Sequence, residues 1–401
     1  MDPGDVEYEP VSVKAVLAEM KDTAELLIDL SYSAVLHGSD EVAMEVLELE
    51  ERMDVLQLQA RMSLLMAARS PEDAEGLAPV LGVVGAAEKI SDAAGDIAKV
   101  VLEDIGVPEA MRTAIPEAVE TVVRGQVVPG SDFAGQTLGA LNLETETGVR
   151  VIAIRRSGEW VVNPDRNTTL EADDVLLLRG TETALSSVYE TITGDSYDPP
   201  EPVESTIDDL DRAVDSIVLM KNMSELAVDL AYGSVLFDSE GVAEEVAELE
   251  AEVDALKSRF EAWVLRAAVR VEDPISLRGL VHLASATEVI SDAALEISEG
   301  VLRGLDTHPV VAAAVEESDE VIVRITVGPD SRLADASLGD LQVKTETGMR
   351  VIAIRRGDGE WVISPGPTTT VHGDDVLIAK GTRSGASRLA DLADAEDAFD
   401  S

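Results

Sequence analysis

Apolar side chains recur at helical intervals in the first part of the chain. One series, spaced by three or four residues, runs over positions 13–31, and a second runs from about Asp40 to Arg69. Each predicts an amphipathic helix. Pro71 directly after Ser70 favours the start of a third helix, to about Glu103, because proline is tolerated at the first helical position. Three helices with short connections are typical of an antiparallel bundle.

The pattern changes after Gly106, where short apolar runs bounded by turn residues replace the helical spacing. Such runs predict strands. The expected strands are Thr121–Val128, Val149–Arg155, Trp160–Val162 and Asp174–Leu178, and the expected helices are Leu138–Leu141 and Glu182–Ile192. This part of the chain is therefore predicted to be a small α/β module of about 75 residues, a modest size for a domain.

Both parts occur twice. The segment from Thr145 to Arg156 returns almost unchanged from Thr345 to Arg356, as a glycine-containing turn followed by an apolar strand that ends in two arginines. Internal repetition of this kind decides the organisation of a chain. The predicted order is a helical domain over 12–105, an α/β domain over 119–193, a linker over 194–204, a helical domain over 205–305 and an α/β domain over 319–392. The predicted fold class is multidomain α+β, in which two three-helix bundles alternate with two small α/β modules.

The charge balance limits the partners that we expect. The 401 residues include 79 acidic and 31 basic ones, a net charge of −48. Such a charge repels nucleic acid phosphates and anionic membrane surfaces, so we expect no nucleic acid partner. The acid is spread over both halves and lysine is scarce, which is typical of adaptation to a very salty cytoplasm, where salt screens self-repulsion.

Targeting and membrane signals are missing from the sequence. The first residues are acidic, unlike a signal peptide. No apolar run approaches the roughly 18–20 residues of a membrane helix. We therefore expect a cytoplasmic protein without direct membrane insertion.

Catalytic signals are also missing. The chain has no cysteine, and its four histidines have no counterparts in the other copy. We find no nucleophile–base constellation and no phosphate-binding loop, and therefore expect no enzyme activity.

The two α/β modules share motifs that resemble a known family. In the first module these are residues 135–141, 151–156 and 170–180 with Pro164, and in the second they are residues 338–341, 351–356 and 373–381 with Pro365. Their order and spacing resemble a TrkA-C (RCK-C) domain. The resemblance implies the ligand-sensing part of a regulator of potassium channels, potassium uptake systems or other cation transporters. Several such domains bind cyclic di-AMP at a pseudo-symmetric dimer interface.

The helical parts are similar to half of a PhoU-like domain, through residues 88–94 and 288–294. Potassium-uptake regulators usually carry a Rossmann-type nucleotide domain before TrkA-C, but no Gly-x-Gly-x-x-Gly follows a strand here, which argues against sensing of NAD or ATP by that route. The resemblance implies a membrane cation channel or transporter as partner, a location peripheral to the membrane through that partner, and a homodimer.

The arginine-ended strand is the first candidate site. Side chains alternate along a strand, so we expect one face to hold Arg150, Ile152, Ile154 and Arg156 and the other to hold Val151, Ala153 and Arg155. Arginine binds phosphate groups in a bidentate manner, and an apolar wall suits a nucleobase. The predicted ligand-binding residues, for a ligand such as cyclic di-AMP, are Ile154, Arg155, Arg156, Pro164, Ile354, Arg355, Arg356 and Pro365.

A second interpretation of this strand is that its arginines only offset nearby Glu and Asp on an exposed sheet face. If a ligand does bind, one arginine of each module is expected to matter strongly and the other little, because Arg155 and Arg156 point to opposite faces.

Acidic residues spaced by four on the predicted helices form the second candidate site. The pairs are Glu25/Asp29, Glu50/Asp54 and Glu88/Asp92, with Glu225/Asp229, Glu250/Asp254 and Glu288/Asp292 in the second copy. PhoU-like proteins bind metal ions through such pairs, and the resemblance implies a divalent metal at Glu88, Asp92, Glu288 and Asp292, which small neighbours make accessible to an adjacent helix. Oxygen ligands favour Mg, Ca or Mn. The alternative is an ordinary polar helix face, because this composition yields roughly 16 such pairs by chance.

Two functions remain open at this point. The first is a cytoplasmic regulator of potassium or other cation transport that senses a small ligand through paired TrkA-C modules. The second is a metal-binding PhoU-like adaptor in phosphate or divalent-cation transport, in which the α/β modules serve only assembly.

Overall fold

The computed structural model describes residues 12–68, 70–108, 111, 121–157, 159–162, 164–180, 182–197, 207–237, 239–303, 309–317, 320–357, 361–363 and 365–395. The chain divides into two compact units, Met1–Ala314 and Val315–Ser401. The predicted domain bounds at 119, 205, 305 and 319 and residues 198–204 of the predicted linker lie outside the described residues.

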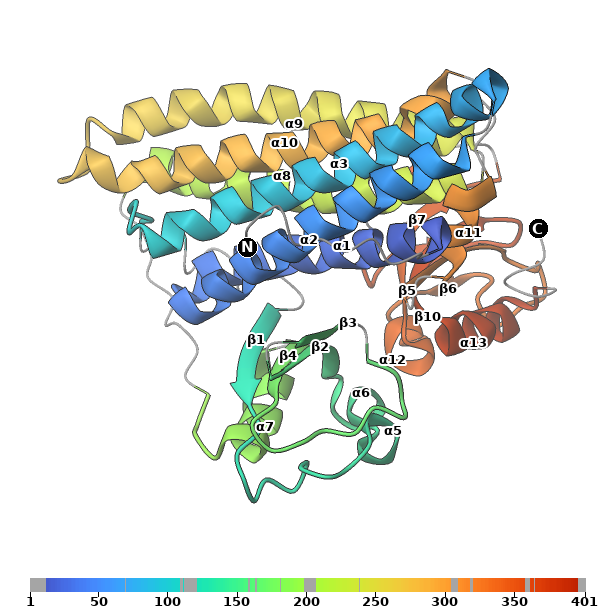
Figure 1. The fold of residues 1–401 in the computed structure, drawn as a ribbon, viewed down its shortest axis with the longest axis horizontal. Coiled ribbons are helices and arrows are strands. Elements are labelled where there is room, and N and C mark those ends of the chain that lie inside the picture. The colour runs from blue at the N-terminus through green and yellow to red at the C-terminus, as the bar shows by residue number, and fades with distance from the viewer. Residues whose placement is uncertain are drawn as a thin grey trace. The chain divides into compact units, whose positions relative to one another are not determined.

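Six long helices run roughly alongside one another in the first unit (Figure 1). They are α1 (Val13–His37), α2 (Asp40–Ala67), α3 (Pro71–Leu102), α8 (Asp208–Leu236), α9 (Glu240–Ala267) and α10 (Arg278–Leu302), the last preceded by a 3₁₀ turn, η1 (Pro274–Leu277). Local signals set their ends. Ser39 and Ser239 accept hydrogen bonds from the backbone N–H groups of Val42 and Val242 at 3.2 and 3.4 Å, which caps α2 and α9.

The two sets of three helices pack together through α3 and α10. Tyr32 of α1, which is buried, hydrogen-bonds Thr287 of α10 at 2.5 Å. Burial raises the pKa of this tyrosine, so its hydroxyl stays neutral. Each set also contributes a lysine to the other, because the ammonium of Lys21 lies 5.6 Å from the ring centre of Tyr232 and that of Lys221 lies 5.4 Å from that of Tyr32. The two sets are therefore halves of one helical body.

The first α/β module belongs to the same unit. Its antiparallel strands are β1 (Thr121–Gln126), β2 (Arg150–Arg156), β3 (Glu159–Val162) and β4 (Val175–Gly180), in the order β1-β4-β2-β3. The short helices are α5 (Leu138–Leu141), α6 (Leu143–Thr147) and α7 (Glu182–Thr193). One face of the sheet packs on α7, and β1 also contacts α1 and α2, so the module lies against the helical body (Figure 1).

The second unit repeats this module. Its main sheet has the order β5-β10-β7-β8, made of β5 (Glu320–Thr326), β7 (Met349–Arg355), β8 (Trp361–Ile363) and β10 (Val376–Thr382), and β6 (Ala336–Ser337) pairs with β9 (Thr370–Val371). The helices are α12 (Val343–Thr347) and α13 (Arg383–Ala393), while α11 (Pro309–Glu317) spans the boundary between the units. The predicted class, α+β with an internal duplication, is confirmed.

The predicted alternation along β2 is wrong in its first half. Val151 pairs with Leu178 and Ala153 with Leu177, so Ile152 is the extra residue of a β-bulge. Val151 and Ile154 therefore both face the core under α7, and Arg150 is on the face of Arg155, not on that of Arg156. β7 carries the same irregularity at Ile352. After the bulge the alternation holds, and Arg155 and Arg156 do point to opposite faces.

Among the described helices, none combines the length and the apolar character that crossing a bilayer requires.

Candidate ligand and metal sites

Arg155 is held by carboxylates of the helical body. Its guanidinium lies 2.7 Å from Glu45 and donates to both oxygens of Glu48 at 3.1 and 2.9 Å. Both glutamates lie on α2, three residues apart, on one face of the helix. Burial raises the pKa of Glu45, while Arg155 and Arg124 lower it. Arg155 is thus offset by glutamates, as the second interpretation of the strand predicts, but on a covered sheet face.

Besides Arg150, this face of the sheet carries two arginines that bind carboxylates of the helical body. Arg124 of β1 donates to Glu45 at 3.2 Å and to Glu41 at 3.0 Å, and Arg179 of β4 donates to Asp29 of α1 at 2.9 Å. We call Arg124, Arg155 and Arg179 the first arginine face. Its charge-assisted hydrogen bonds fix the module to α1 and α2.

Arg156 points the other way, into the module itself. It donates to the two carboxylate oxygens of Asp174 at 2.7 Å each and to the carbonyl of Thr169 at 2.7 Å. Asp174 is 1% exposed and also accepts the backbone N–H of Glu171 at 2.7 Å. The fork of Arg156 therefore ties the end of β2 to the turn that begins β4.

The second module repeats this arrangement. Arg356 pairs with the buried Asp375 and donates to the carbonyl of Thr370 at 2.9 Å. In each module this aspartate is the second of an Asp-Asp dipeptide, and aspartate is a residue type typical of turns. The first aspartate does have a left-handed backbone, with φ of 72° at Asp173 and 68° at Asp374, but the second binds the arginine. The arginine and the aspartate both recur in the second copy, and this joint recurrence could have indicated that the two side chains pair.

The predicted apolar wall is not on the surface. Ile154 and Ile354 are fully buried in the cores of their modules, whereas Pro164 and Pro365 are half-buried. Of the eight predicted ligand residues, the arginine pairs are therefore split between two faces and the isoleucines are inside.

The second module has its own arginine face, consisting of Arg324, Arg355 and Lys380. The register places Arg324 opposite Ile378 and Arg355 opposite Val376, so both arginines are on one face of the sheet. Burial and the neighbouring Arg355 guanidinium lower the pKa of Arg324. Among the described residues of this unit, no carboxylate pairs with either arginine. The two modules thus differ in the contacts of Arg155 and Arg355, two of the predicted ligand-binding residues.

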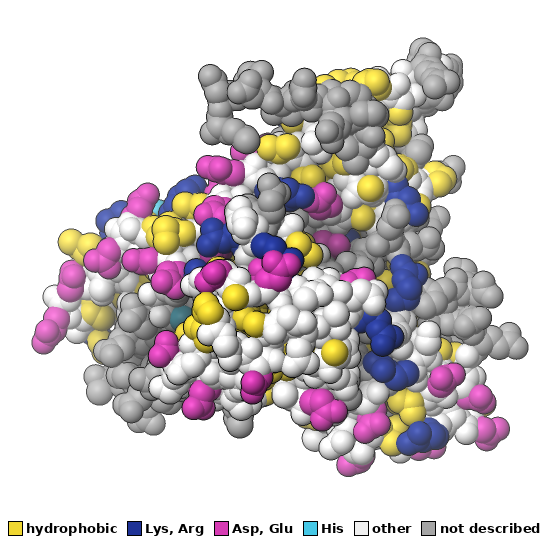
Figure 2. All heavy atoms as spheres, turned by 60° about the horizontal axis from the view of Figure 1, so that its bottom comes forward, with side chains coloured by type: hydrophobic (Ala, Val, Ile, Leu, Met, Phe, Trp, Pro, Cys, Tyr) yellow, Lys and Arg dark blue, Asp and Glu magenta, His cyan; other side chains and the backbone are white. Residues whose placement is uncertain are grey.

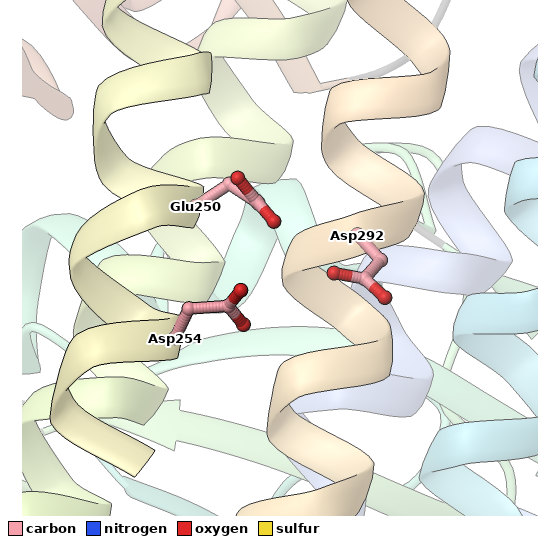
Figure 3. Close-up of side chains that lie close together, drawn as sticks. All are labelled: Glu250, Asp254 and Asp292. Carbon is pink, nitrogen blue, oxygen red and sulfur yellow. The ribbon is translucent and has the colours of Figure 1, made fainter. Parts of the chain in front are cut away.

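Three carboxylates meet between α9 and α10. Oxygen atoms of Glu250, Asp254 and Asp292 all lie within 4.8 Å of one another, and Figure 3 shows the three side chains pointing toward one another from the two helices. Burial raises the pKa of Glu250 and of Asp292, and the mutual repulsion of the carboxylates adds to it. An oxygen-only set of this kind suits a hard divalent cation.

The equivalent carboxylates in the first copy, Glu50, Asp54 and Asp92, have Lys99 beside them. The ammonium of Lys99 lies 3.9 Å from Glu50 and 3.1 Å from Asp96. It counteracts the burial that raises the pKa of Glu50. At the position of Lys99 the second copy has Glu299, which pairs with Arg303. Near Asp292 of the second copy, Lys257 and Lys89 also lower the pKa of that carboxyl, but they form ion pairs with Glu288 and Glu296.

These contacts place the four predicted metal-binding residues in two different kinds of environment. Asp92 and Asp292 belong to the two carboxylate clusters, whereas Glu88 pairs with Arg61 at 3.0 Å and Glu288 pairs with Lys257. The sequence alone did not predict that Asp292 lies close to Glu250 and Asp254, because their proximity depends on how the two helices are rotated about their axes.

Figure 2 shows one face, on which Asp and Glu side chains are scattered and Lys and Arg side chains lie among them.

Comparison with known proteins identifies both kinds of domain. Residues 122–193 and 322–394 match the TrkA-C domain, and residues 17–101 and 217–301 match the PhoU domain. A probable potassium channel protein 2 of Methanocaldococcus jannaschii is 30% identical over 120 residues, which cover 28% of this chain and 35% of that protein. The Ktr system potassium uptake protein C of Bacillus subtilis is 36% identical over 65 residues, which cover 16% and 29%. The chain thus spans about a third of the length of these curated relatives.

Among solved structures, the GsuK RCK domain is similar with 15% identity over 86% of this chain and 79% of that chain, but the TM-score of 0.19 is too low to relate the two folds as wholes. The sequence matches decide the family, because they recur in both copies and cover most of the chain. The chain belongs to the PhoU and TrkA-C families, with two domains of each in alternation.

Proposed function

We propose that this chain is a cytoplasmic regulatory protein of potassium or other cation transport, which senses a small anionic ligand through its TrkA-C domains. The relatives named for a potassium channel and for potassium uptake support the transport process. A membrane channel or transporter is the partner that this role requires.

The observation that carries the ligand proposal is the contrast between Arg155 and Arg355. The Arg155 guanidinium is already bound by Glu45 and Glu48, whereas Arg355 lies beside Arg324 with no carboxylate among the described residues of its unit. Two adjacent guanidinium groups favour a doubly charged anion such as the phosphates of cyclic di-AMP. Ligand bound there would change the relative populations of the module's poses through its differential affinity.

Calorimetric titration with cyclic di-AMP in concentrated KCl tests this proposal. We expect binding by the intact chain and a loss of at least about tenfold in affinity for Arg355→Ala, because a charge-assisted hydrogen bond contributes roughly 1.5–3 kcal/mol. Arg155→Ala is the matched control and should bind as the unaltered chain does. An absence of heat with the intact chain, or equal affinity in both variants, would overturn the proposal.

A second candidate function is a metal-binding PhoU-like adaptor in phosphate or divalent-cation transport. The proximity of Glu250, Asp254 and Asp292 favours it. In this role the second copy would hold the ion, while Lys99 would keep the first copy free of metal by supplying its own positive charge.

Metal binding is expected to differ between the copies. Added Mn²⁺ should raise the thermal midpoint of the chain, and Asp292→Asn should abolish that increase, because it removes one of three oxygen ligands. Asp92→Asn, the equivalent change beside Lys99, should leave the increase intact. Lys99→Gln should add a second bound ion, as counted by elemental analysis. Equal responses of Asp92→Asn and Asp292→Asn would contradict the assignment.

A further inference from the structure

The connection between α9 and α10 exposes large apolar side chains. Leu265, in the last turn of α9, is 71% exposed, and Val269, just after the helix, is 86% exposed. Ile275 of the 3₁₀ turn η1 is exposed as well. The two helices end here in a hairpin at one end of the helical body (Figure 1). A single exposed apolar residue is ordinary, but several close together with polar residues around them indicate an interaction site.

Arginines and a tryptophan surround these apolar side chains. Arg266 and Arg278 are exposed, and Trp263 is half-buried. Arg270 is exposed too, but it pairs with Asp209 at 2.8 Å. Residues 264–282 contain three arginines and two acids, in a chain with 79 acidic and 31 basic residues, so the local charge is opposite in sign to that of the chain. We call these residues the α9–α10 tip: Trp263, Leu265, Arg266, Val269, Ile275 and Arg278.

The equivalent connection in the first half has the apolar exposure without the charge. Leu65, at the end of α2, is 74% exposed, as Leu265 is at the end of α9, and Met66 beside it is exposed. The tryptophan and the two exposed arginines are replaced there by residues with neither a ring nor a charge: Ser63, Met66 and Ala78 at the positions of Trp263, Arg266 and Arg278. The first half therefore supplies a control for the effect of charge within the same chain.

This combination of side chains fits an anionic lipid surface. Apolar side chains enter the boundary between headgroups and acyl chains, and tryptophan rings favour the same depth. Arginines bind the lipid phosphates, and their long stems let the guanidinium groups reach the headgroups while the methylenes stay on apolar surface. The side chains stand out from the end of a hairpin, and this shape suits a broad, deformable surface better than the groove of a folded partner.

The net charge of −48 does not oppose such a contact. At physiological ionic strength, charges more than about 8 Å away are largely screened. Lipid phosphates at the α9–α10 tip therefore interact mainly with Arg266 and Arg278, and the repulsion expected from the net charge applies to the rest of the surface.

We propose that the α9–α10 tip docks on the anionic lipid surface of a membrane. Val269 and Ile275 enter the headgroup region, while Arg266 and Arg278 bind phosphates. This contact goes beyond the proposed function, because it needs neither the small ligand nor a metal ion. It would also assist that function, since a regulator held at the membrane meets its transporter at a higher effective concentration.

Flotation of the full chain with lipid vesicles tests the proposal. Vesicles of phosphatidylglycerol and phosphatidylcholine in equal parts are compared with vesicles of phosphatidylcholine alone, over a range of KCl concentrations. We expect the unaltered chain to float with the anionic vesicles at low KCl, and much less with the neutral ones or at high KCl. Val269→Asp/Ile275→Asp should lower the partition coefficient at least about thirtyfold. Arg266→Gln/Arg278→Gln should lower it roughly twentyfold, because each basic residue near an anionic surface contributes about fivefold.

Leu65→Asp/Met66→Asp is the matched control, because it places the same two charges on exposed apolar residues of the first half. It should bind the anionic vesicles as the unaltered chain does. All three variants alter exposed side chains, so their thermal midpoints should stay close to that of the unaltered chain, which separates lost docking from misfolding.

An unaltered chain that does not float with the anionic vesicles, or that floats equally with the neutral ones, would overturn the proposal, as would an equal loss in Leu65→Asp/Met66→Asp. If the chain ignored both kinds of vesicle but bound membranes of its source organism through Val269 and Ile275, the tip would recognise a membrane protein and not lipid. Failure of cyclic di-AMP binding would not affect these outcomes.

Discussion

Lys21→Met is expected to destabilise the helical body by about 3 kcal/mol, the low end of the cost of removing one partner from a buried ion pair. The Lys21 side chain is 1% exposed, and its ammonium lies 2.8 Å from the Glu25 carboxylate. It also lies over the ring of Tyr232, which comes from the other half of the duplicated body. Methionine keeps the volume but leaves the Glu25 carboxylate, itself 11% exposed, without its cation.

A double-mutant cycle measures this interaction. Urea unfolding of Lys21→Met, Glu25→Gln and the double variant should show that the double variant recovers most of the stability lost in Lys21→Met, because no charge is then left uncompensated. Lys221→Met, the equivalent change in the second half, should behave similarly, since Lys221 pairs with Glu225 and lies over Tyr32. A change below about 0.5 kcal/mol in Lys21→Met would show that the pair is effectively solvated.

The elements of this fold could be read from local signals. Ser70-Pro71 does open α3, and Gly148, before β2, has a φ of 76° that only a glycine adopts readily. The internal duplication supported the remaining assignments, because the same pattern of apolar and polar residues occurs in both copies. The bulge at Ile152 could not be predicted from the sequence, because it depends on how β2 pairs with β4. The periodicity of apolar residues within one strand gives no information about the register of the neighbouring strand.

The candidate sites were less predictable than the fold for the same reason. Arg155 and its partner Glu48 are 107 positions apart, and α2 offers many other acids at helical spacing. The cluster of Glu250, Asp254 and Asp292 requires two helices to be rotated toward each other. What the sequence did contain was the difference between the copies. Lys99 of the first copy, for example, is replaced by Glu299 in the second.

These differences between copies suggest how a duplicated chain acquires two roles. In the first copy the arginine face is bound to α1 and α2 and the carboxylate cluster has a lysine, so both candidate sites are satisfied internally. In the second copy Arg324 and Arg355 have no carboxylate partner among the described residues of their unit. A copy whose charged side chains are paired internally is suited to a structural role, and a copy whose charged side chains lack such partners is suited to binding.

Arg156→Ala is expected to loosen the first α/β module specifically. Asp174 is 1% exposed, and it would lose the bidentate partner that holds it and keep only the N–H of Glu171. Because Arg156 is itself partly exposed, water can relieve some of the loss, and we expect a cost of about 2–3 kcal/mol rather than the full penalty of a buried charge. The turn before β4 should open first, since Arg156 also holds the carbonyl of Thr169.

Hydrogen exchange of the intact chain distinguishes this structural role from a ligand-binding one. Amides of β2 and β4 should exchange roughly thirty- to a hundredfold faster in Arg156→Ala, while those of β7 and β10 keep their protection as an internal control. Arg356→Ala should give the mirror result, because Arg356 holds Asp375 in the same way. If Arg156→Ala instead left protection unchanged and removed cyclic di-AMP binding, Arg156 would belong to a ligand site. The ligand-binding role would then belong to Arg156, and the structural role to Arg155 on the opposite face of the sheet.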